Sequence, residues 1–340
     1  MTAGLLIVLA IVLILPFSLK IVEQNLEVFL FIMGISAVII SGTFSSKLFE
    51  EILQNRFLYF ITIAVFVSSI LFRLLKNVIR SFINKILVLM PLKIFVMLLI
   101  IVLGLASSVI TAIIAALILV EIINLLPVNR GERIHIDIIA CFAIGLGAVL
   151  TPVGEPLSTV VVTKMNTDFM YLIREVGIYI IPGIIILGLV GFFYIRNGSI
   201  NTDLPDEIEE EETYKDSFIR TGKIFLFVLA LELLGTGFKP LVDMYVIQLK
   251  SWLLYWINMI SAILDNATLT AAEVSNKMSS LQIQAVLMGL LVSGGMLIPG
   301  NIPNIISAGK LRIKSKEWAR LGVPLGLGIM SVYFGIIFLI

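Results

Sequence analysis

Two short polar segments interrupt long apolar stretches of this chain, and both carry side chains with oxygen atoms that could bind a cation. The first, TPVGEPLS, runs from Thr151 to Ser158 and includes Glu155. The second, IPGNIPNIIS, runs from Ile298 to Ser307 and includes Asn301 and Asn304. Carboxylate, amide and carbonyl oxygens are hard ligands, which suit Na⁺ or a proton and match soft metals poorly. We call these segments the first break and the second break.

Glu155 is the strongest candidate in the first break, because a carboxylate inside a bilayer costs about 2.5 kcal/mol or more and needs a partner or a wet cavity. It could ligate a cation or carry a proton. It could also be structural, either as an anion at the positive end of the half-helix that starts at Leu157 or as the ion-pair partner of Lys164.

Two further segments place polar residues in the middle of apolar runs. SSVITAIIAA begins at Ser107, and SAILDNATLT begins at Ser261 and includes Asp265 and Asn266. These side chains could complete a cation shell, although an N-cap role competes for Asp265 and Asn266. Ser and Thr are also common packing residues in membrane helices. The candidate ion-binding residues are therefore Glu155, Asp265, Asn266, Thr151, Gly154, Thr111, Ser107, Ser108, Thr268, Gly300, Asn301 and Asn304, with Na⁺ expected at Glu155, Asp265, Asn266 and Asn301.

The remaining acidic residues and the histidine are weaker candidates. We expect Glu121, Glu232 and Glu273 near an interface, in structural or solvated positions, and His135 has no ligand set nearby. No separate cofactor is expected besides the coupling ion, Na⁺ or H⁺.

Composition predicts that these residues lie in a membrane protein. Hydrophobic residues make up 59% of the chain and charged residues 14%, against roughly 25% charged in soluble domains. The mean hydropathy is +1.09. A net charge of +1 gives no reason to expect a nucleic-acid partner. We expect an all-α polytopic protein in the plasma membrane, with the lipid bilayer as its first partner.

The polar segments divide the chain into two halves around an acidic stretch. Residues 1–195 form the predicted first repeat, with a hairpin at about 94–124 and a broken helix at 134–165. Residues 196–216 are a predicted cytoplasmic linker, and residues 217–340 form the second repeat. That repeat has a hairpin at about 241–274 and a broken helix at 281–311. A basic amphipathic helix over 73–93 is expected to lie in the interface.

Two alignments between the halves predict inverted repeats. SSVITAIIAA pairs with SAILDNATLT, and the stretch from Gly147 pairs with that from Gly294 when Gly154 is set opposite Gly300. Short basic loops mark the cytoplasmic side. We place the basic segments inside and treat both hairpins as re-entrant. The hairpin and broken helix of one half then have the opposite orientation to those of the other half, and both termini lie outside. Two broken helices in corresponding positions are the best sequence signal for a transporter binding site.

The two tips and two breaks resemble those of the ion transporter superfamily. That superfamily includes arsenical-pump-type permeases, divalent-anion:Na⁺ symporters and NhaD-type Na⁺/H⁺ antiporters. The NhaD-like pattern GG-x-x-[ST]-P-[IL]-G-D-x-T-T is similar to GAVLTPVGEPLST here, with Glu155 at its acidic position. A second pattern, A-x-[IL]-D-N-x-P-L-x-A-A, is similar to SAILDNATLTAA. At 340 residues the chain would belong to a short branch of cation transporters.

This resemblance implies Na⁺/H⁺ antiport by an elevator-like motion in a homodimer, with Glu155 and Asp265 alternating between Na⁺ and H⁺. One departure puts the coupling ratio in question, because the chain has Ile110-Thr111-Ala112 where the relatives tend to carry Asp-Asn. The alternative function is Na⁺-coupled symport of a small organic or inorganic anion, and a scaffold or channel-like pore is a third possibility. We expect a transporter, not an enzyme.

Overall fold

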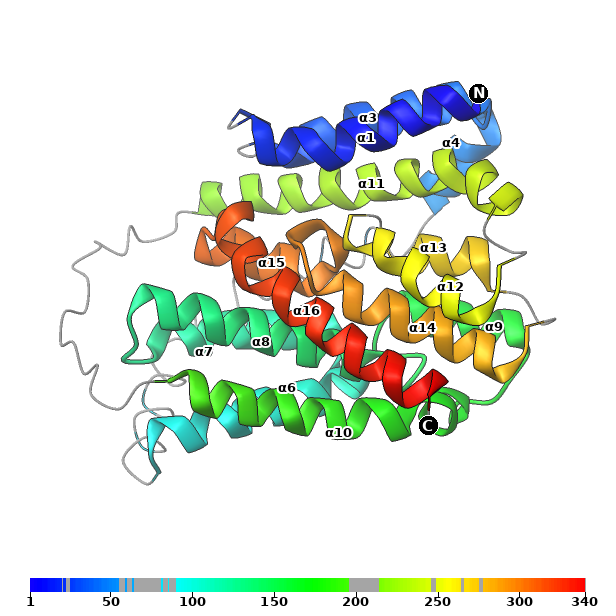
Figure 1. Cartoon of the computed structure of the whole chain (residues 1–340). Helices are drawn as coiled ribbons and strands as arrows, with labels where there is room; N and C mark the ends of the chain where they lie inside the picture. Colours follow the sequence, from blue (N-terminus) through cyan, green and yellow to red (C-terminus); the bar gives the residue numbers. More distant parts are fainter. Residues whose placement is uncertain are drawn as a thin grey trace.

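The computed structural model describes most of the chain as helices (Figure 1). The described residues are 1–19, 21–22, 25–54, 59, 63, 81, 85, 90–195, 214–245, 249–263, 266–274 and 278–339. In order, the elements are α1 (Thr2–Ser18), α3 (Leu26–Ser41), α4 (Ser46–Gln54), α6 (Leu92–Ile110), α7 (Ala112–Leu125), α8 (Arg130–Ala148), α9 (Pro156–Met165), α10 (Tyr171–Tyr194), α11 (Tyr214–Tyr245), α12 (Ser251–Ile257), η1 (Asn258–Ala262), α13 (Asn266–Glu273), α14 (Ser280–Gly294), η2 (Ile298–Gly300), α15 (Ile302–Leu311) and α16 (Ser315–Phe338). No strand occurs among these residues, so the expected all-α class is confirmed.

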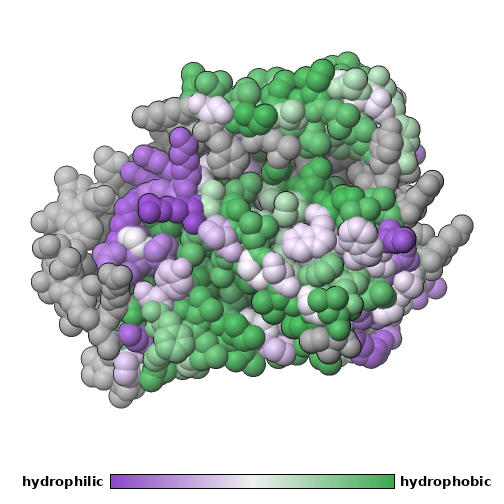
Figure 2. Space-filling model, in the orientation of Figure 1, coloured by the Kyte–Doolittle hydropathy of each residue, from purple (hydrophilic) through white to green (hydrophobic). Residues whose placement is uncertain are grey.

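Three of the described helices are long and apolar enough to cross a membrane, namely α6, α10 and α16. Shorter apolar helices, α3, α7 and α14 among them, have 10 to 17 residues. Apolar surface covers the middle of the molecule in the view of Figure 2, and hydrophilic surface gathers toward its two ends. This distribution is the one expected of a helical protein in a bilayer.

Helices α1, α3 and α11 form a layer along one side of the molecule (Figure 1). Small residues hold α3 and α11 together at short range. A Cβ atom on Gly34 would stand 2.8 Å from the Cβ of Leu233, and one on Gly237 would stand 2.6 Å from the Cβ of Ala37. Such small residues let membrane helices approach closely. The layer meets the rest of the molecule where α11 packs on α13 and α1 contacts α16.

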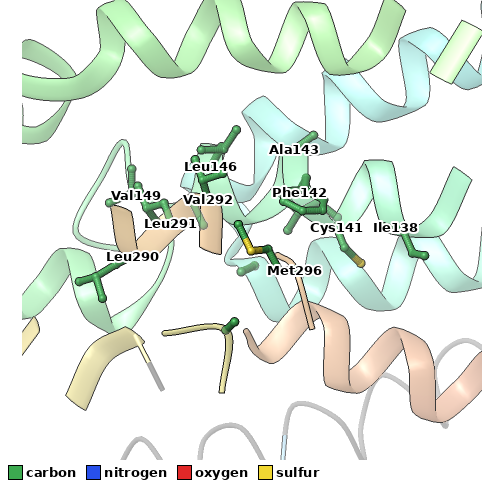
Figure 3. Packing of buried hydrophobic residues seen from close by; sticks show 14 of the residues in the cluster. Ile138, Cys141, Phe142, Ala143, Leu146, Val149, Leu290, Leu291, Val292 and Met296 are labelled. Atoms are coloured by element: carbon green, nitrogen blue, oxygen red, sulfur yellow. The ribbon is translucent and has the colours of Figure 1, made fainter. Parts of the chain in front are cut away.

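The other elements form two series with the same order. In the first, α6 ends at Ile110, α7 returns beside it, α8 ends at Ala148, and α9 and α10 follow. In the second, α12 with η1 is followed by α13, α14, α15 and α16. Helices α8 and α14 form the centre, where their apolar side chains pack together around Phe142 and Met296 (Figure 3). Every residue from Ile136 to Ala148 of α8 and from Ala285 to Gly294 of α14 is buried.

Local capping sets the starts of these central helices. Asn129 and Glu132 form a capping box at the start of α8, and Ser279 and Gln282 form one at the start of α14. Each box satisfies backbone N–H groups that the first helical turn leaves without a partner. Helix α8 therefore begins at Arg130, four residues before the start predicted from hydropathy.

The second hairpin, by contrast, begins later than predicted. Helix α11 continues through Lys239 and Pro240 to Tyr245, and the next helix begins at Ser251, so the predicted hairpin start at about 241 is wrong. The acidic linker 196–216 lies outside the described residues except at 214–216, which belong to α11. The amphipathic helix expected over 73–93 also lies outside them, apart from 81, 85 and 90–93.

Candidate functional site

The first break lies between Ala148, the last residue of α8, and Pro156, the first of α9. The chain turns so tightly that a Cβ atom on Gly154 would collide with the carbonyl oxygen of Ala148. Ser158 Oγ, from the first turn of α9, donates a hydrogen bond to the same carbonyl at 3.4 Å. Glycine is thus required at 154, and the freed carbonyl of α8 gains a partner inside the protein, as a membrane helix break needs.

The tip between α6 and α7 lies against this break. Thr111 has φ 76°, and its Oγ1 accepts a hydrogen bond from Ile114 N at the start of α7. The backbone N–H of Ala112 donates to Gly154 O at 2.9 Å, and Thr151 Oγ1 donates to Ser108 O. The expected candidates of the first tip and the first break are therefore neighbours.

Glu155 lies in this neighbourhood, buried, directly before the first residue of α9. The N–H groups at a helix start carry partial positive charge, which favours a carboxylate at this position. This placement fits both interpretations of Glu155, the ion ligand and the structural anion.

The second break repeats this arrangement with a different side chain. Asn304 Nδ2 donates to Gly294 O, at the end of α14, at 2.8 Å and to Leu297 O, before η2, at 2.9 Å, so one amide satisfies two carbonyls at the break. A Cβ atom on Gly300 would stand 2.6 Å from Gly294 O and 2.8 Å from Ser261 O. The second tip therefore also lies against its own break.

Ser261 and Asn266 link the second tip to α14. Ser261 Oγ donates to Leu290 O at 3.0 Å and also contacts Asn266 Oδ1. Asn266 is buried at the start of α13. Asp265 and the side chain of Thr268 lie outside the described residues.

The two halves meet at these breaks. The Asn301 amide lies over Gly145 of α8, where a Cβ atom would stand 2.5 Å from Asn301 Nδ2. Helix α15, which leaves the second break, packs on α7 from the first tip, and α13 from the second tip packs on α9 from the first break. Helices α7, α9, α13 and α15 thus all begin at a tip or a break and run away from it (Figure 1).

Two acidic residues expected near an interface, in structural or solvated positions, are buried, so the solvated alternative is wrong for both. Glu121 is paired with Lys310 of α15, with Oε1 and Nζ 2.6 Å apart. Glu273 is 2% exposed and lies beside the buried Asn258. The sequence shows a charged residue inside an apolar helix, which is a signal for a buried polar group. It does not show the partner of that residue on a distant helix. The side chain of Glu232 lies outside the described residues.

The Glu121–Lys310 pair supports a prediction about stability. Lys310→Met leaves a buried carboxylate without its cation, which costs about 3–5 kcal/mol in folded proteins. We expect the double variant Glu121→Gln/Lys310→Met to be more stable than either single variant, because it buries no unpaired charge. The stabilities of the parent, the two single variants and the double variant, measured by unfolding the purified proteins in detergent, complete a double-mutant cycle. A double variant that loses the sum of the two single losses would show that the pair contributes nothing.

Comparison with known proteins places the chain in one family. The family described as "Protein of unknown function (DUF1646)" matches residues 2–340. Because this match spans nearly the whole chain, the protein belongs to the DUF1646 family. No curated protein matches the chain.

Proposed function

We propose that this member of the DUF1646 family is a secondary active ion transporter of the plasma membrane. Its leading function is Na⁺/H⁺ antiport at the two breaks. One observation carries the proposal: two interrupted helices, one in each half, each meet a polar tip from the same half inside a helical membrane protein. Interrupted membrane helices survive where they line a cavity or a binding site, and paired interruptions mark transporter sites.

Equivalent hydrogen bonds support an inverted repeat. With Gly154 set opposite Gly300, Ser158 falls opposite Asn304 and Ala148 opposite Gly294. Both side chains donate to the carbonyl at the end of the preceding helix, Ser158 to Ala148 O and Asn304 to Gly294 O.

The tips support the same alignment. Ser107 donates to Ile144 O at 3.0 Å, and Ser261 donates to Leu290 O at 3.0 Å. The alignment that sets Gly154 opposite Gly300 also sets Ile144 opposite Leu290. Agreement in such contacts is more specific than agreement in hydropathy, because each needs a particular polar atom at a particular place.

Basic residues support the orientation. Arg130, the first residue of α8, donates to Arg312 O at 3.2 Å and pairs with Glu317 at 3.3 Å, so the loops that follow α7 and α15 share one end of the molecule. Lys314 and Lys316 are exposed at that end, and both termini lie at the other (Figure 1). The positive-inside rule places the basic end in the cytoplasm. The tips of 94–124 and 251–274 then enter from opposite sides as re-entrant hairpins.

In this mechanism a carboxylate binds either a proton or Na⁺ and carries one of them at a time. Glu155 would serve the first break and Asp265 the second tip, while hydroxyl, amide and backbone oxygens of the neighbouring candidates complete the Na⁺ shell. Asn301 falls opposite Glu155 in the alignment, so the second break offers a neutral oxygen where the first offers a carboxylate. The layer of α1, α3 and α11 would be the scaffold of a homodimer, against which the remaining helices move as an elevator.

One feature of the geometry favours the alternative, Na⁺-coupled symport of a small anion. Helices α7, α9, α13 and α15 all begin at the tips and breaks. The partial positive charge of a helix start attracts anions, and broken helices in transporters use it to hold substrate carboxylates.

Proton movement in proteoliposomes separates the two functions. Purified protein is reconstituted with a pH-sensitive dye inside, and Na⁺, Li⁺ or K⁺ is added outside, with protein-free vesicles as the control. Cation-driven proton movement supports antiport. A folded protein that moves no protons but takes up an anion when Na⁺ is supplied supports symport. A folded protein that does neither overturns the transporter proposal.

A further inference from the structure

Asp137 is a buried carboxylate that the proposed site does not use. It lies in the middle of α8, two turns from Arg130, and is 0% exposed. Within the described part of the chain, neither Oδ1 nor Oδ2 has a hydrogen-bond partner. No ion pair joins it to a described residue, since the ion pairs there involve other acids. An isolated buried charge of this kind is far too costly to persist, so the group takes up a proton or a cation.

Other unpartnered oxygens lie on the helix that faces Asp137. The Ser307 hydroxyl of α15 is within interaction range of both the Asp137 carboxyl and the Cys141 thiol, one turn further along α8. Ser307 Oγ is itself buried and has no hydrogen-bond partner of normal geometry in the described structure. Asn304 Oδ1, one turn earlier on α15, also has none. Residues three apart on a helix are neighbours on one face.

These groups lie on a polar face that leads from the second break to the basic end. Along α15, Asn304 and Ser307 are 0% exposed, Lys310 contacts Glu121, and Arg312 is exposed. The steps from Asn304 to Ser307 and from Ser307 to Lys310 are three residues each, or about 4.5 Å. Polar atoms on this face therefore extend from the buried break toward the basic end, where Arg312 directly follows α15, and Asp137 is a carboxylate beside this face.

We propose that Asp137 and Ser307 form a second, proton-carrying position between the second break and the basic end of the molecule. The Asp137 carboxyl is protonated at rest and exchanges its proton with water that enters along the α15 face. On release, the O–H bond of the carboxyl breaks and an O–H bond forms on a water molecule, which becomes hydronium. On uptake, an O–H bond of hydronium breaks and the O–H bond of the carboxyl forms again. A proton is the fitting occupant because one carboxyl, one hydroxyl and one thiol offer too few hard oxygens for a Na⁺ shell.

Charged and titratable groups surround this position at a distance. On α8 itself they are Arg133, which has its own interactions, His135 and Cys141. The helices packed against α8 bring further groups toward the basic end, namely Lys93 on α6, Glu121 on α7, Lys310 on α15, and Glu317 and Arg320 on α16. Since Lys310 is paired with Glu121, its charge is already compensated.

Infrared spectroscopy of the full-length protein in lipid nanodiscs tests this proposal at neutral pH. We expect a protonated-carboxyl C=O stretching band that Asp137→Asn removes and that the exposed control Glu50→Gln leaves unchanged. In D₂O the band should shift to lower frequency within minutes. The variant Ser307→Ala keeps the Asp137 carboxyl, so the band should remain. Its frequency should change, because the hydroxyl that contacts the carboxyl is gone.

The outcomes are distinct. A spectrum in which Asp137→Asn removes no protonated-carboxyl band overturns the proposal, and so does a band that does not shift in D₂O. A band unaffected by Ser307→Ala removes Ser307 from the position and also overturns the proposal as stated. None of these measurements depends on transport, so a protein that moves no cation would contradict the proposed function and leave this test unchanged.

Discussion

Glu155→Gln is expected to abolish cation-driven proton movement while leaving the protein folded. Glutamine keeps the size of the side chain and one acceptor oxygen, but it can neither carry a proton nor supply a negative charge to Na⁺. Glu155 lies buried at the start of α9, beside the tip of the first hairpin. A solvent-exposed carboxylate cannot reach this position, so none can take over the role of Glu155. The proteoliposome assay measures the loss directly, and Asp265→Asn is expected to give the same result at the second tip.

The matched control is Glu50→Gln, which makes the same chemical change at an exposed position on α4. It should transport at the parent rate. Thermal unfolding and gel filtration of each variant show whether the fold is retained. If folded Glu155→Gln moves protons at the parent rate, Glu155 is only the structural anion at the start of α9, and the proposed mechanism loses its first carboxylate.

Local sequence patterns predicted the parts of the fold that depend on single segments. The all-α class follows from composition. The interruptions at Thr151–Ser158 and Ile298–Ser307 follow from Pro and Gly, which cannot continue a helix without loss. The alignment of Gly154 with Gly300 also came from sequence alone; the inverted repeat that it implies stays a prediction, which the hydrogen bonds of Ser158 and Asn304 support.

The parts that depend on packing between distant helices could not be predicted. Hydropathy started the second hairpin at about 241, but α11, which packs on α3, continues to Tyr245. Tertiary contacts of this kind override local propensity. Asp137 was also missed, because the sequence does not show which side of its helix faces the protein interior. Only the packing of α15 on α8 shows that it is buried.

Gly147→Ala is expected to cause the largest loss of stability of any single methyl group added to the centre. A Cβ atom there would collide with the carbonyl oxygen of Gly104 on α6 and would stand 3.0 Å from Ser107 Oγ. The obstacle is backbone, which cannot rotate away, so α6 and α8 must separate. That separation also stretches the bond from Ser107 to Ile144 O. Overpacking usually costs about 1–3 kcal/mol, and a clash with backbone at the central helix pair should reach or exceed that range.

Gly309→Ala is the matched control, because it adds the same methyl group to helix α15 where nothing lies within 4 Å. Alanine loses less backbone entropy than glycine in a helix, so this variant should gain about 0.5–1 kcal/mol. Yield of monodisperse protein in detergent and thermal unfolding compare the two variants. Equal stability of Gly147→Ala and the parent would mean that α6 and α8 do not approach at Gly104. The hydrogen bond from Ser107 to Ile144 O would then no longer support the repeat, because it depends on the same close approach of α6 and α8.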